Sequence, residues 1–254
     1  MKESYLEELL NYKVQLYNNP EFIETDPVSI PHSFSKKEDI EIAGFLTASI
    51  AWGNRSVIIK NAARLMQLMD NSPYEFVINF EPEDLRQFEN FKHRTFQFPD
   101  LQFFLTALQD IYRNLGGLEA VFSRYPDDIK LSLDYFRKIF LQTAHLPRSE
   151  KHLSSPLKGS ACKRLNMFLR WMVRKDNKQV DFGIWKQIPM SALKLPLDVH
   201  SGNVARKLGL LSRKQNDWKA VEEVTGNLAQ FNPEDPVIYD YALFGMGVFE
   251  KTGF

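Results

Sequence analysis

The fold is decided by SPLKGSACKRLNMFLRWMVRKD at residues 155–176, together with LKLPLDVHSGNVARKLG at residues 193–209. The first segment holds six lysines and arginines between residues 158 and 175, and no acid precedes Asp176. The second segment carries a lone Asp-x-His, formed by Asp198 and His200. Because the whole chain has a formal net charge of +0, so much positive charge in one segment needs a specific explanation.

The charges are distributed unevenly along the rest of the chain. Residues 1–50 hold nine acids and four bases, whereas residues 151–175 hold seven bases and no acid. Residues 199–216 hold four further bases and again no acid. This distribution predicts one basic face opposite a more acidic side, and it favours a nucleic-acid partner in spite of the neutral total.

The composition limits the class of protein. With 254 residues, 44% of them apolar and 13% aromatic, the chain can fill the core of one sizeable domain or of two small lobes. A single cysteine, Cys162, excludes a disulfide framework and any four-cysteine zinc or iron–sulfur site. The five histidines show no ligand spacing, so we expect no metal and no cofactor.

The sequence also predicts where the protein works. The first seventeen residues carry Glu3, Glu7 and Glu8 where a signal peptide would need an apolar core. No run of about eighteen apolar residues occurs. We therefore expect a cytoplasmic protein with no export signal and no membrane span.

Helical patterns dominate the chain, and no stretch alternates with a period of two, so we expect an all-α protein. Ser35 and Glu38 form a predicted capping box at the start of one helix, and a second begins near Ser56. Asp235 is the predicted N-cap of the last helix, with Pro236 in its first position. The predicted helices span residues 35–53, 56–70, 99–117, 127–144, 217–231 and 235–249, in addition to the basic one.

The basic helix has two faces when residues 160–175 are placed at 100° per residue. One face is an apolar core stripe that includes Phe168 and Met172. The other is a cationic ridge within about 60°, formed by Lys163, Met167, Arg170 and Arg174. This ridge could be an ordinary solvated surface. However, it lacks the acidic partners at i+4 that a solvated helix usually carries, which favours a phosphate-binding role.

The residues around the two motifs support the same interpretation. Gly159 and Ser160 are expected to present free backbone N–H groups at the start of the basic helix, where cations and amides together bind phosphate. In the second segment, Asp198 could simply be the N-cap of the helix that follows. From the residues alone, the capping role and a chemical role for Asp198 have similar weight.

These motifs resemble the helix-hairpin-helix DNA glycosylase superfamily, and above all its archaeal-type 8-oxoguanine DNA glycosylases. CKRLNMFLR places Lys163 where those enzymes carry a catalytic lysine in the first turn of a helix, and LPLDVH places Asp198 where they carry an aspartate. DIEIAGFLTASIAWGNR resembles their early helix, which ends in a polar residue at the DNA, here Asn54. DPVIYDYALFGMG resembles their closing helix. The similarity covers roughly residues 35–70 and 155–250.

The resemblance implies an all-α fold of two helical lobes with a cleft between them, acting as a monomer on damaged DNA without a cofactor. It implies that Lys163 forms a Schiff base with the sugar and that Asp198 stabilises the sugar cation. The implied DNA contacts are Lys158, Gly159, Ser160, Arg164, Arg170, Arg174, His200, Arg206 and Asn54. The candidate base-pocket aromatics, each of which could instead belong to the core, are Trp52, Trp171 and Phe96.

The sequence departs from the family pattern in two places. A lone Gly159 replaces the usual Gly-x-Gly ahead of the lysine, and Lys163 and Asp198 lie 35 positions apart, a longer interval than in most members. The alternative function is a nucleic-acid-binding protein on the same scaffold that no longer cuts, with Lys163 on a phosphate. The lesion, the choice between DNA and RNA, and lyase activity beyond base excision stay open.

Overall fold

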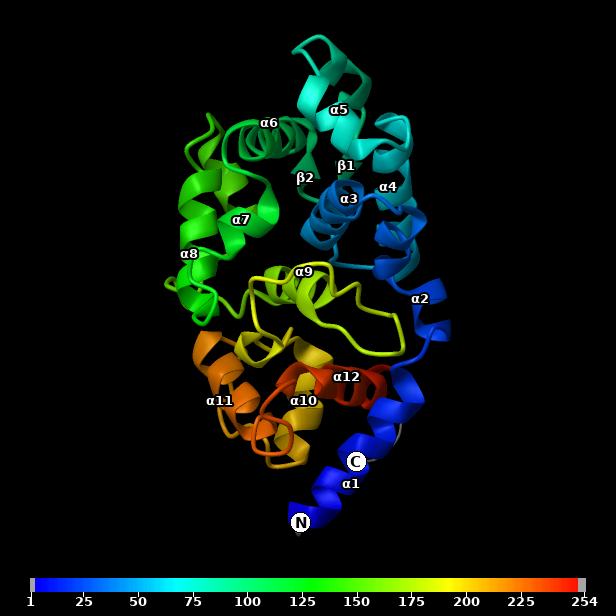
Figure 1. Cartoon of the computed structure of the whole chain (residues 1–254), viewed down its shortest axis with the longest axis vertical. Helices are drawn as coiled ribbons and strands as arrows, with labels where there is room; N and C mark the ends of the chain where they lie inside the picture. Colours follow the sequence, from blue (N-terminus) through cyan, green and yellow to red (C-terminus); the bar gives the residue numbers. More distant parts are fainter. Residues whose placement is uncertain (1–2, 251–254) are drawn as a thin grey trace. The chain divides into compact units, whose positions relative to one another are not determined.

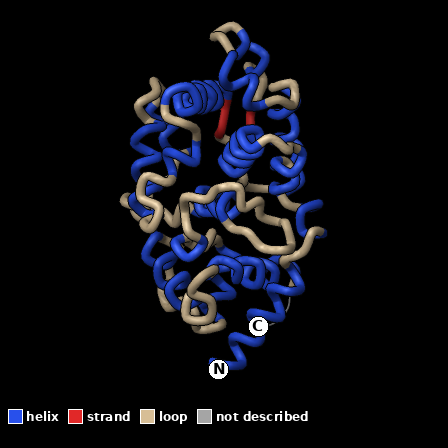
Figure 2. Tube along the Cα trace, in the orientation of Figure 1, coloured by secondary structure: helices blue, strands red, loops and turns tan. Residues whose placement is uncertain are grey.

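The computed structural model describes residues 3–250, and helices make up most of them, as Figure 2 shows. Within this range, the strands are two-residue segments, β1 (Lys92–His93) and β2 (Phe96–Gln97), which pair antiparallel. The prediction of a mostly helical, all-α chain is confirmed.

The chain divides into two compact units. Unit 1 combines Met1–Phe22 with Ser155–Phe254, and unit 2 is the intervening segment Ile23–Ser154. The N-terminal helix therefore belongs with the C-terminal third of the chain. Both Lys163 and Asp198 lie in unit 1.

Unit 2 is built around a core of phenylalanines contributed by several helices. Phe45 packs on Phe104, Phe136 and Phe140, with ring centroids 5.5 to 5.9 Å apart. The elements of this unit, together with the helix that spans its boundary, are α2 (Glu21–Thr25), η1 (Pro27–Ser29), η2 (Pro31–Ser33), α3 (Lys37–Ser49), α4 (Arg55–Leu68), α5 (Pro73–Asn79), η3 (Asp84–Phe88), β1, β2, α6 (Phe98–Asn114), α7 (Leu118–Phe122), α8 (Ile129–Phe140) and η4 (Pro147–His152).

Unit 1 holds the basic helix and the elements that surround it. These elements are α1 (Glu3–Tyr17), α9 (Lys163–Val173), η5 (Met190–Ala192), α10 (Val199–Lys207), α11 (Trp218–Leu228), η6 (Pro236–Ile238) and α12 (Tyr239–Phe249). The last helix, α12, packs against both α1 and α10, and Figure 1 shows α1 in blue beside α12 in red. Leu10, Leu243 and Met246 are among the buried residues of the shared core.

Glycines allow α12 to approach its neighbours closely. A Cβ on Gly245 would lie 2.1 Å from the ring of Tyr17 in α1, and a Cβ on Gly247 would lie 3.0 Å from the Cβ of His200 in α10. Real Cβ atoms essentially never come as close to another atom as Gly245 would require, so α12 can pack this closely on α1 only with glycine there, whereas a Cβ on Gly247 would require α10 to give slightly. The first turn of α10 is therefore held firmly against α12.

One predicted helix cap is wrong, and the other precedes a short 3-10 helix rather than the last α-helix. Ser35 does not cap α3, because Lys36 occupies the N-cap position and makes no side-chain capping bond. Asp235 occupies the N-cap position of η6 and not that of α12, and its carboxylate accepts a hydrogen bond from Arg174 instead of making a capping bond. Pro236 is the first residue of this 3-10 helix, as its fixed φ favours.

A long loop joins α9 to α10, drawn in tan in Figure 2. It first folds back on the end of α9, where the N–H groups of Phe182 and Trp185 donate to the carbonyls of Trp171 and Met172 at 2.8 and 2.9 Å. This return places Asp181 beside the helix that it follows. In the described range of residues, no helix has the length and apolar character to cross a membrane.

Candidate active site

Lys163 is the first residue of α9, as predicted. The residue before it, Cys162, is buried and adopts a left-handed conformation with φ of 49°. The preceding turn is tied to the start of α11, because the N–H of Trp218 donates to the carbonyl of Gly159 at 3.1 Å. The Lys163 side chain remains one-third exposed, so its amine is fixed at its base and accessible at its tip.

Asp198 is the N-cap of α10. Its Oδ1 accepts hydrogen bonds from the backbone N–H of Ser201 at 3.0 Å and from the Ser201 hydroxyl at 3.2 Å. The Ser201 Oγ accepts in return from the N–H of Asp198 at 3.0 Å, which completes a capping box. Because one carboxylate oxygen satisfies the cap, the other is available for a second partner.

That second partner is Lys163. Its Nζ lies 3.5 Å from Asp198 Oδ2, and the Asp198 side chain is 17% exposed. The two residues stand 35 positions apart in the sequence and meet at the first turns of two different helices. The structure therefore brings together an accessible amine and a half-buried carboxylate, and it gives Asp198 a capping bond as well.

The predicted cationic ridge is wrong as a surface feature. Arg170 is 4% exposed and Arg174 is 0% exposed, so neither side chain reaches solvent or a phosphate. Met167 is buried on the same face. The ridge points into unit 1, where charged side chains need partners because an unpaired buried charge is very costly.

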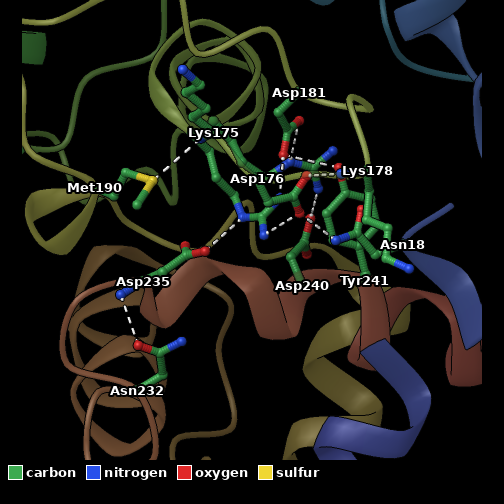
Figure 3. Close-up of polar contacts among 12 residues, drawn as sticks. Asn18, Lys175, Asp176, Lys178, Asp181, Met190, Asn232, Asp235, Asp240 and Tyr241 are labelled. Atoms are coloured by element: carbon green, nitrogen blue, oxygen red, sulfur yellow. Dashed lines mark hydrogen bonds and ion pairs between the residues drawn. The ribbon is translucent and has the colours of Figure 1, made fainter. Parts of the chain in front are cut away.

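The partners of the two arginines are carboxylates from other parts of unit 1. The Arg170 guanidinium donates to Asp240 in α12 and, at 3.2 Å, to Asp181. Arg174 donates to Asp181 at 3.1 Å, to Asp235 at 2.9 Å and to Asp176 at 2.8 Å. Figure 3 shows these four carboxylates gathered around one set of polar contacts.

Tyr241 completes this buried network. Its hydroxyl donates to Asp181 Oδ2 at 2.9 Å, and the Arg170 guanidinium lies 4.5 Å from the centre of its ring. Burial raises the pKa of Tyr241 well above its usual range, so it stays a donor at any ordinary pH. In the described part of the chain, the ion pairs of Arg170 and Arg174 involve four carboxylates, and the Lys163–Asp198 pair adds a third cation and a fifth carboxylate. We call this set the acid–base row.

Burial inside this network changes the pKa of several of its carboxylates. Burial, opposed by Arg170, raises the pKa of Asp240 to about 6. Burial also raises the pKa of Asp235. For Asp176 burial acts in the same direction, but hydrogen bonds from Asn18 and Arg174 outweigh it and lower the pKa. The pKa of Asp240 is thus well above the usual value of an aspartate.

The turn ahead of α9 does not offer free amides as predicted. The N–H of Gly159 donates to the carbonyl of Pro156 at 3.0 Å, and that of Ser160 donates to the carbonyl of Ser155 at 3.1 Å. Both residues precede Lys163 by several positions and lie outside the helix. The expectation of a phosphate site on these two amides is therefore wrong. The exposed Lys158 side chain of the same turn stays available for a DNA contact.

The remaining cations of the two segments lie in different environments. His200 is exposed in the first turn of α10. Arg164 is partly buried, and burial lowers its pKa to about 10. Arg206 is occupied inside unit 1, where it donates to the carbonyl of Arg213 at 2.8 Å and to Asn216 at 2.5 Å. Asn216 in turn donates to the carbonyl of Asp198 at 2.8 Å, so Arg206 supports the Asp198 loop.

Two of the three candidate base-pocket aromatics are core residues. Trp171 is fully buried in α9, and Phe96 is 1% exposed and packs on Phe104 and His152. A ring buried on both faces cannot stack on a base, so the pocket role predicted for these two residues is wrong. Trp52, in unit 2, is partly exposed and stacks on His152 with ring centroids 5.8 Å apart.

Asn54 also lies in unit 2, where it is exposed and caps α4. Its Oδ1 accepts from the N–H of Val57 at 3.3 Å and from the hydroxyl of Ser56 at 2.6 Å. The start of this helix was predicted one residue late, since α4 begins at Arg55. Among residues 3–250, no group of three or more His, Cys, Asp or Glu side chains is arranged to hold a metal ion.

Sequence reasoning missed the acids that neutralise α9. Asp240 stands alone in the apolar stretch IYDYALFGMG, and Asp181 follows Val180 in another apolar stretch. A carboxylate in such surroundings is rarely buried without a cationic partner. A lone aspartate in an apolar stretch therefore indicates a buried cationic partner, and the arginines of α9 lie in the same unit.

The chain was also compared with known proteins. No curated protein and no solved structure matches it. A family model described as "Protein of unknown function (DUF2400)" matches residues 26–249, which include Lys163, Asp198 and Asp240. Because this match spans most of the sequence, the chain belongs to the DUF2400 family.

Proposed function

We propose that this protein is a DNA glycosylase of the helix-hairpin-helix type that removes a damaged base through a lysine Schiff base and can then cleave the strand. The observation that carries the proposal is the distance of 3.5 Å between Lys163 Nζ and Asp198 Oδ2. The resemblance to the glycosylases implied that Asp198 lies against Lys163. Their meeting at the starts of two helices supports their use as one catalytic pair.

The residue types of the pair suit this chemistry. The unprotonated amine of Lys163 attacks C1′ of the damaged nucleotide, the C1′–N bond breaks, and the base leaves with the bonding electrons and takes up a proton. The attached nitrogen then loses a proton, its lone pair breaks the C1′–O4′ bond, and O4′ takes up a proton, which leaves an iminium ion between Lys163 and C1′. Removal of a C2′ proton then breaks the C3′–O bond and releases the 3′ phosphate.

Asp198 has two functions in this proposal. Its ionised carboxylate stabilises positive charge as it develops on the sugar. Electrostatic stabilisation by a preorganised group is usually the largest single contribution to an enzyme's rate enhancement. Its second oxygen is held by Ser201, so the carboxylate does not have to reorganise during the reaction. The protein thereby orients the charge before the substrate arrives.

The surface around the pair is less basic than the sequence predicted. With Arg170 and Arg174 inside, the exposed residues that remain for phosphate contacts include Lys158 and His200. Each phosphate contact contributes about one unit to the slope of log affinity against log salt concentration. We therefore expect a shallow salt dependence for duplex binding.

Borohydride trapping tests the proposal. The wild-type protein is incubated with duplexes that carry 8-oxoguanine, uracil or an abasic site, and sodium borohydride reduces any iminium ion to a stable adduct. We expect an adduct with wild-type protein and none with Lys163→Gln, because glutamine cannot form the Schiff base. Duplex affinity should survive in Lys163→Gln.

Lys158→Gln is the matched control, since it removes another accessible lysine five positions away. At a DNA concentration that saturates both proteins it should still be trapped, because Lys158 contributes at most one phosphate contact to binding. Trapping that persists in Lys163→Gln and disappears in Lys158→Gln would assign the nucleophile to the turn and refute the role of Lys163. A wild-type protein that binds duplex DNA but traps none of these substrates would favour the non-catalytic alternative, in which Lys163 and Asp198 form only a salt bridge.

A further inference from the structure

Asn216 lies in the loop between α10 and α11 and joins that loop to the first turn of α10. Its side-chain Nδ2 donates a hydrogen bond to the backbone carbonyl of Asp198 at 2.8 Å, and its Oδ1 accepts one from the Arg206 guanidinium at 2.5 Å. Arg206 is itself held in place, because its Nε donates to the carbonyl of Arg213 at 2.8 Å. Since the Asn216 amide has a partner for its donor and one for its acceptor, its orientation is fixed.

The contact from Asn216 completes the set of bonds that hold Asp198. The N–H of Asp198 donates to the Ser201 hydroxyl, and its Oδ1 accepts from the N–H and the hydroxyl of Ser201. Its carbonyl accepts from the N–H of Gly202 at 3.0 Å and from Asn216 at 2.8 Å. Its second carboxylate oxygen, Oδ2, lies 3.5 Å from Lys163 Nζ. The backbone and one carboxylate oxygen of Asp198 are thus anchored, and the other oxygen is directed at the amine.

Gly202 makes room for the Asn216 amide on the surface of α10. A Cβ at position 202 would lie 2.8 Å from Asn216 Oδ1 and 2.9 Å from its Nδ2, and real Cβ atoms essentially never come this close to another atom. The amide cannot move aside without losing its bonds to Arg206 and Asp198. Glycine at this position therefore allows Asn216 to reach the Asp198 carbonyl.

The segment that contains Asn216 is also attached to the turn ahead of α9. Asp217 forms an isolated β-bridge with Ser160, and the N–H of Trp218 donates to the carbonyl of Gly159 at 3.1 Å. Three consecutive residues thus connect the turn before α9 with the first turn of α10. Because the two side chains of the candidate pair stand at the starts of these helices, the segment sets the distance between them.

We propose that Asn216 is a positioning residue that keeps the Asp198 carboxylate opposite the amine of Lys163. It acts through the backbone of Asp198. Without its hydrogen bond, the Asp198 carbonyl keeps only the bond within the helix, and the first turn of α10 loses this attachment to the loop before α11. The catalytic consequence rests on the proposed function, whereas the placement of Asp198 is a property of the folded chain alone.

The placement is measured without DNA by zero-length crosslinking. A water-soluble carbodiimide activates a carboxylate, and attack by an adjacent amine forms an amide while the carbodiimide leaves as a urea. We expect wild-type protein to form this amide between Lys163 and Asp198, quantified by peptide mass spectrometry, because the two groups lie 3.5 Å apart.

Asn216→Asp is the variant that tests the role of the amide. It keeps the shape of the side chain and the acceptor for Arg206, but it replaces the donor with an oxygen that repels the Asp198 carbonyl. The rate of crosslinking between Lys163 and Asp198 should fall by about tenfold, because reactions between held groups are sensitive to displacements of about 1 Å.

Asn227→Asp is the matched control. Asn227 lies in α11, and its Nδ2 also donates to a backbone carbonyl, that of Leu210 at 2.9 Å. The same substitution there removes a bond of the same kind away from Asp198, so the crosslinking rate should match that of the wild type. Gly202→Ala is a second variant, because the added methyl group displaces the Asn216 amide without changing its chemistry. It should slow crosslinking as well, even if Asn216→Asp fails to fold.

With DNA, a positioning role predicts a slower reaction and unchanged binding. The single-turnover rate of adduct formation is measured at saturating DNA, on the 8-oxoguanine or uracil duplex that the wild type converts. This rate should fall by about tenfold in Asn216→Asp, whereas duplex affinity should stay close to that of the wild type. In Asn227→Asp, both the rate and the affinity should match the wild type.

Three results would overturn the proposal: an unchanged crosslinking rate in a folded Asn216→Asp or Gly202→Ala protein, an equal fall in Asn227→Asp, or no Lys163–Asp198 crosslink in the wild type. Slower crosslinking in the variants of a protein that traps no DNA would leave the positioning role standing and reject the proposed function. Unchanged crosslinking in the variants of a protein that does trap DNA would reject the positioning role and leave the proposed function standing.

Discussion

The burial of Arg174 leads to a prediction that separates a structural role from a DNA-binding role. Its guanidinium is 0% exposed and contacts Asp176, Asp181 and Asp235 at 2.8 to 3.1 Å. Replacing it with alanine would leave these carboxylates without their main cation. We therefore expect Arg174→Ala to destabilise unit 1 strongly.

The magnitude follows from the geometry of the network. Removing one member of a buried ion pair costs about 3–5 kcal/mol, because the remaining charge stays buried without compensation. A folded domain of this kind has a total stability of about 5–15 kcal/mol. At about 2–4 °C per kcal/mol for a chain of this size, the melting temperature should fall by about 10 °C.

The assay is thermal unfolding followed by circular dichroism, combined with duplex affinity below the transition. Lys158→Ala is the control, and as an exposed residue it should change the unfolding free energy by no more than about 0.5 kcal/mol. A melting temperature for Arg174→Ala within about 1 °C of the wild type would refute the reasoning. A loss of duplex affinity at unchanged stability would return Arg174 to the DNA-binding surface.

Two further predictions concern carboxylates. Asp198→Asn should keep the capping bond with Ser201, because asparagine caps a helix about as well as aspartate, so the melting temperature should barely change. Single-turnover base excision should slow by about a hundredfold, because the negative charge is lost. Full excision activity at an unshifted melting temperature would leave Asp198 with the capping role alone. Burial raises the pKa of Asp240 to about 6 in the folded protein. Between about pH 4 and 6, the folded protein therefore keeps a proton on Asp240 that the unfolded chain has lost. As the pH rises through this range, Asp240 lowers the free energy of unfolding. In denaturant titrations, the unfolding free energy of Asp240→Asn should rise relative to that of the wild type from about pH 4 to 6 and stay at a constant difference above about pH 6. A difference that does not change across this range would contradict the raised pKa of Asp240.

The local sequence predicted the helical class and the positions of Lys163 and Asp198 at the starts of two helices. Period-3.6 patterns and turn residues act over a few neighbouring positions, so most helices lie where their patterns indicated, with ends that differ by a few residues. Lys163 at the start of α9 and Asp198 at the start of α10 were identified from short motifs, and the structure brings their side chains to 3.5 Å. The resemblance to the glycosylases singled out this pair, and the residues alone left the role of Asp198 open.

Tertiary structure decided which cations face solvent. The wheel of α9 showed a ridge without acids at i+4, and this absence favoured a free surface, but it gave no information about partners far away in the chain. Arg170 meets Asp240 across 70 positions, and Arg174 meets Asp235 across 61. Such pairs form only when the C-terminal segment that carries Asp235 and α12 folds against α9, so no local pattern contains them. For the same reason, the sequence assigned a phosphate-binding surface where the folded chain has a buried ionic core.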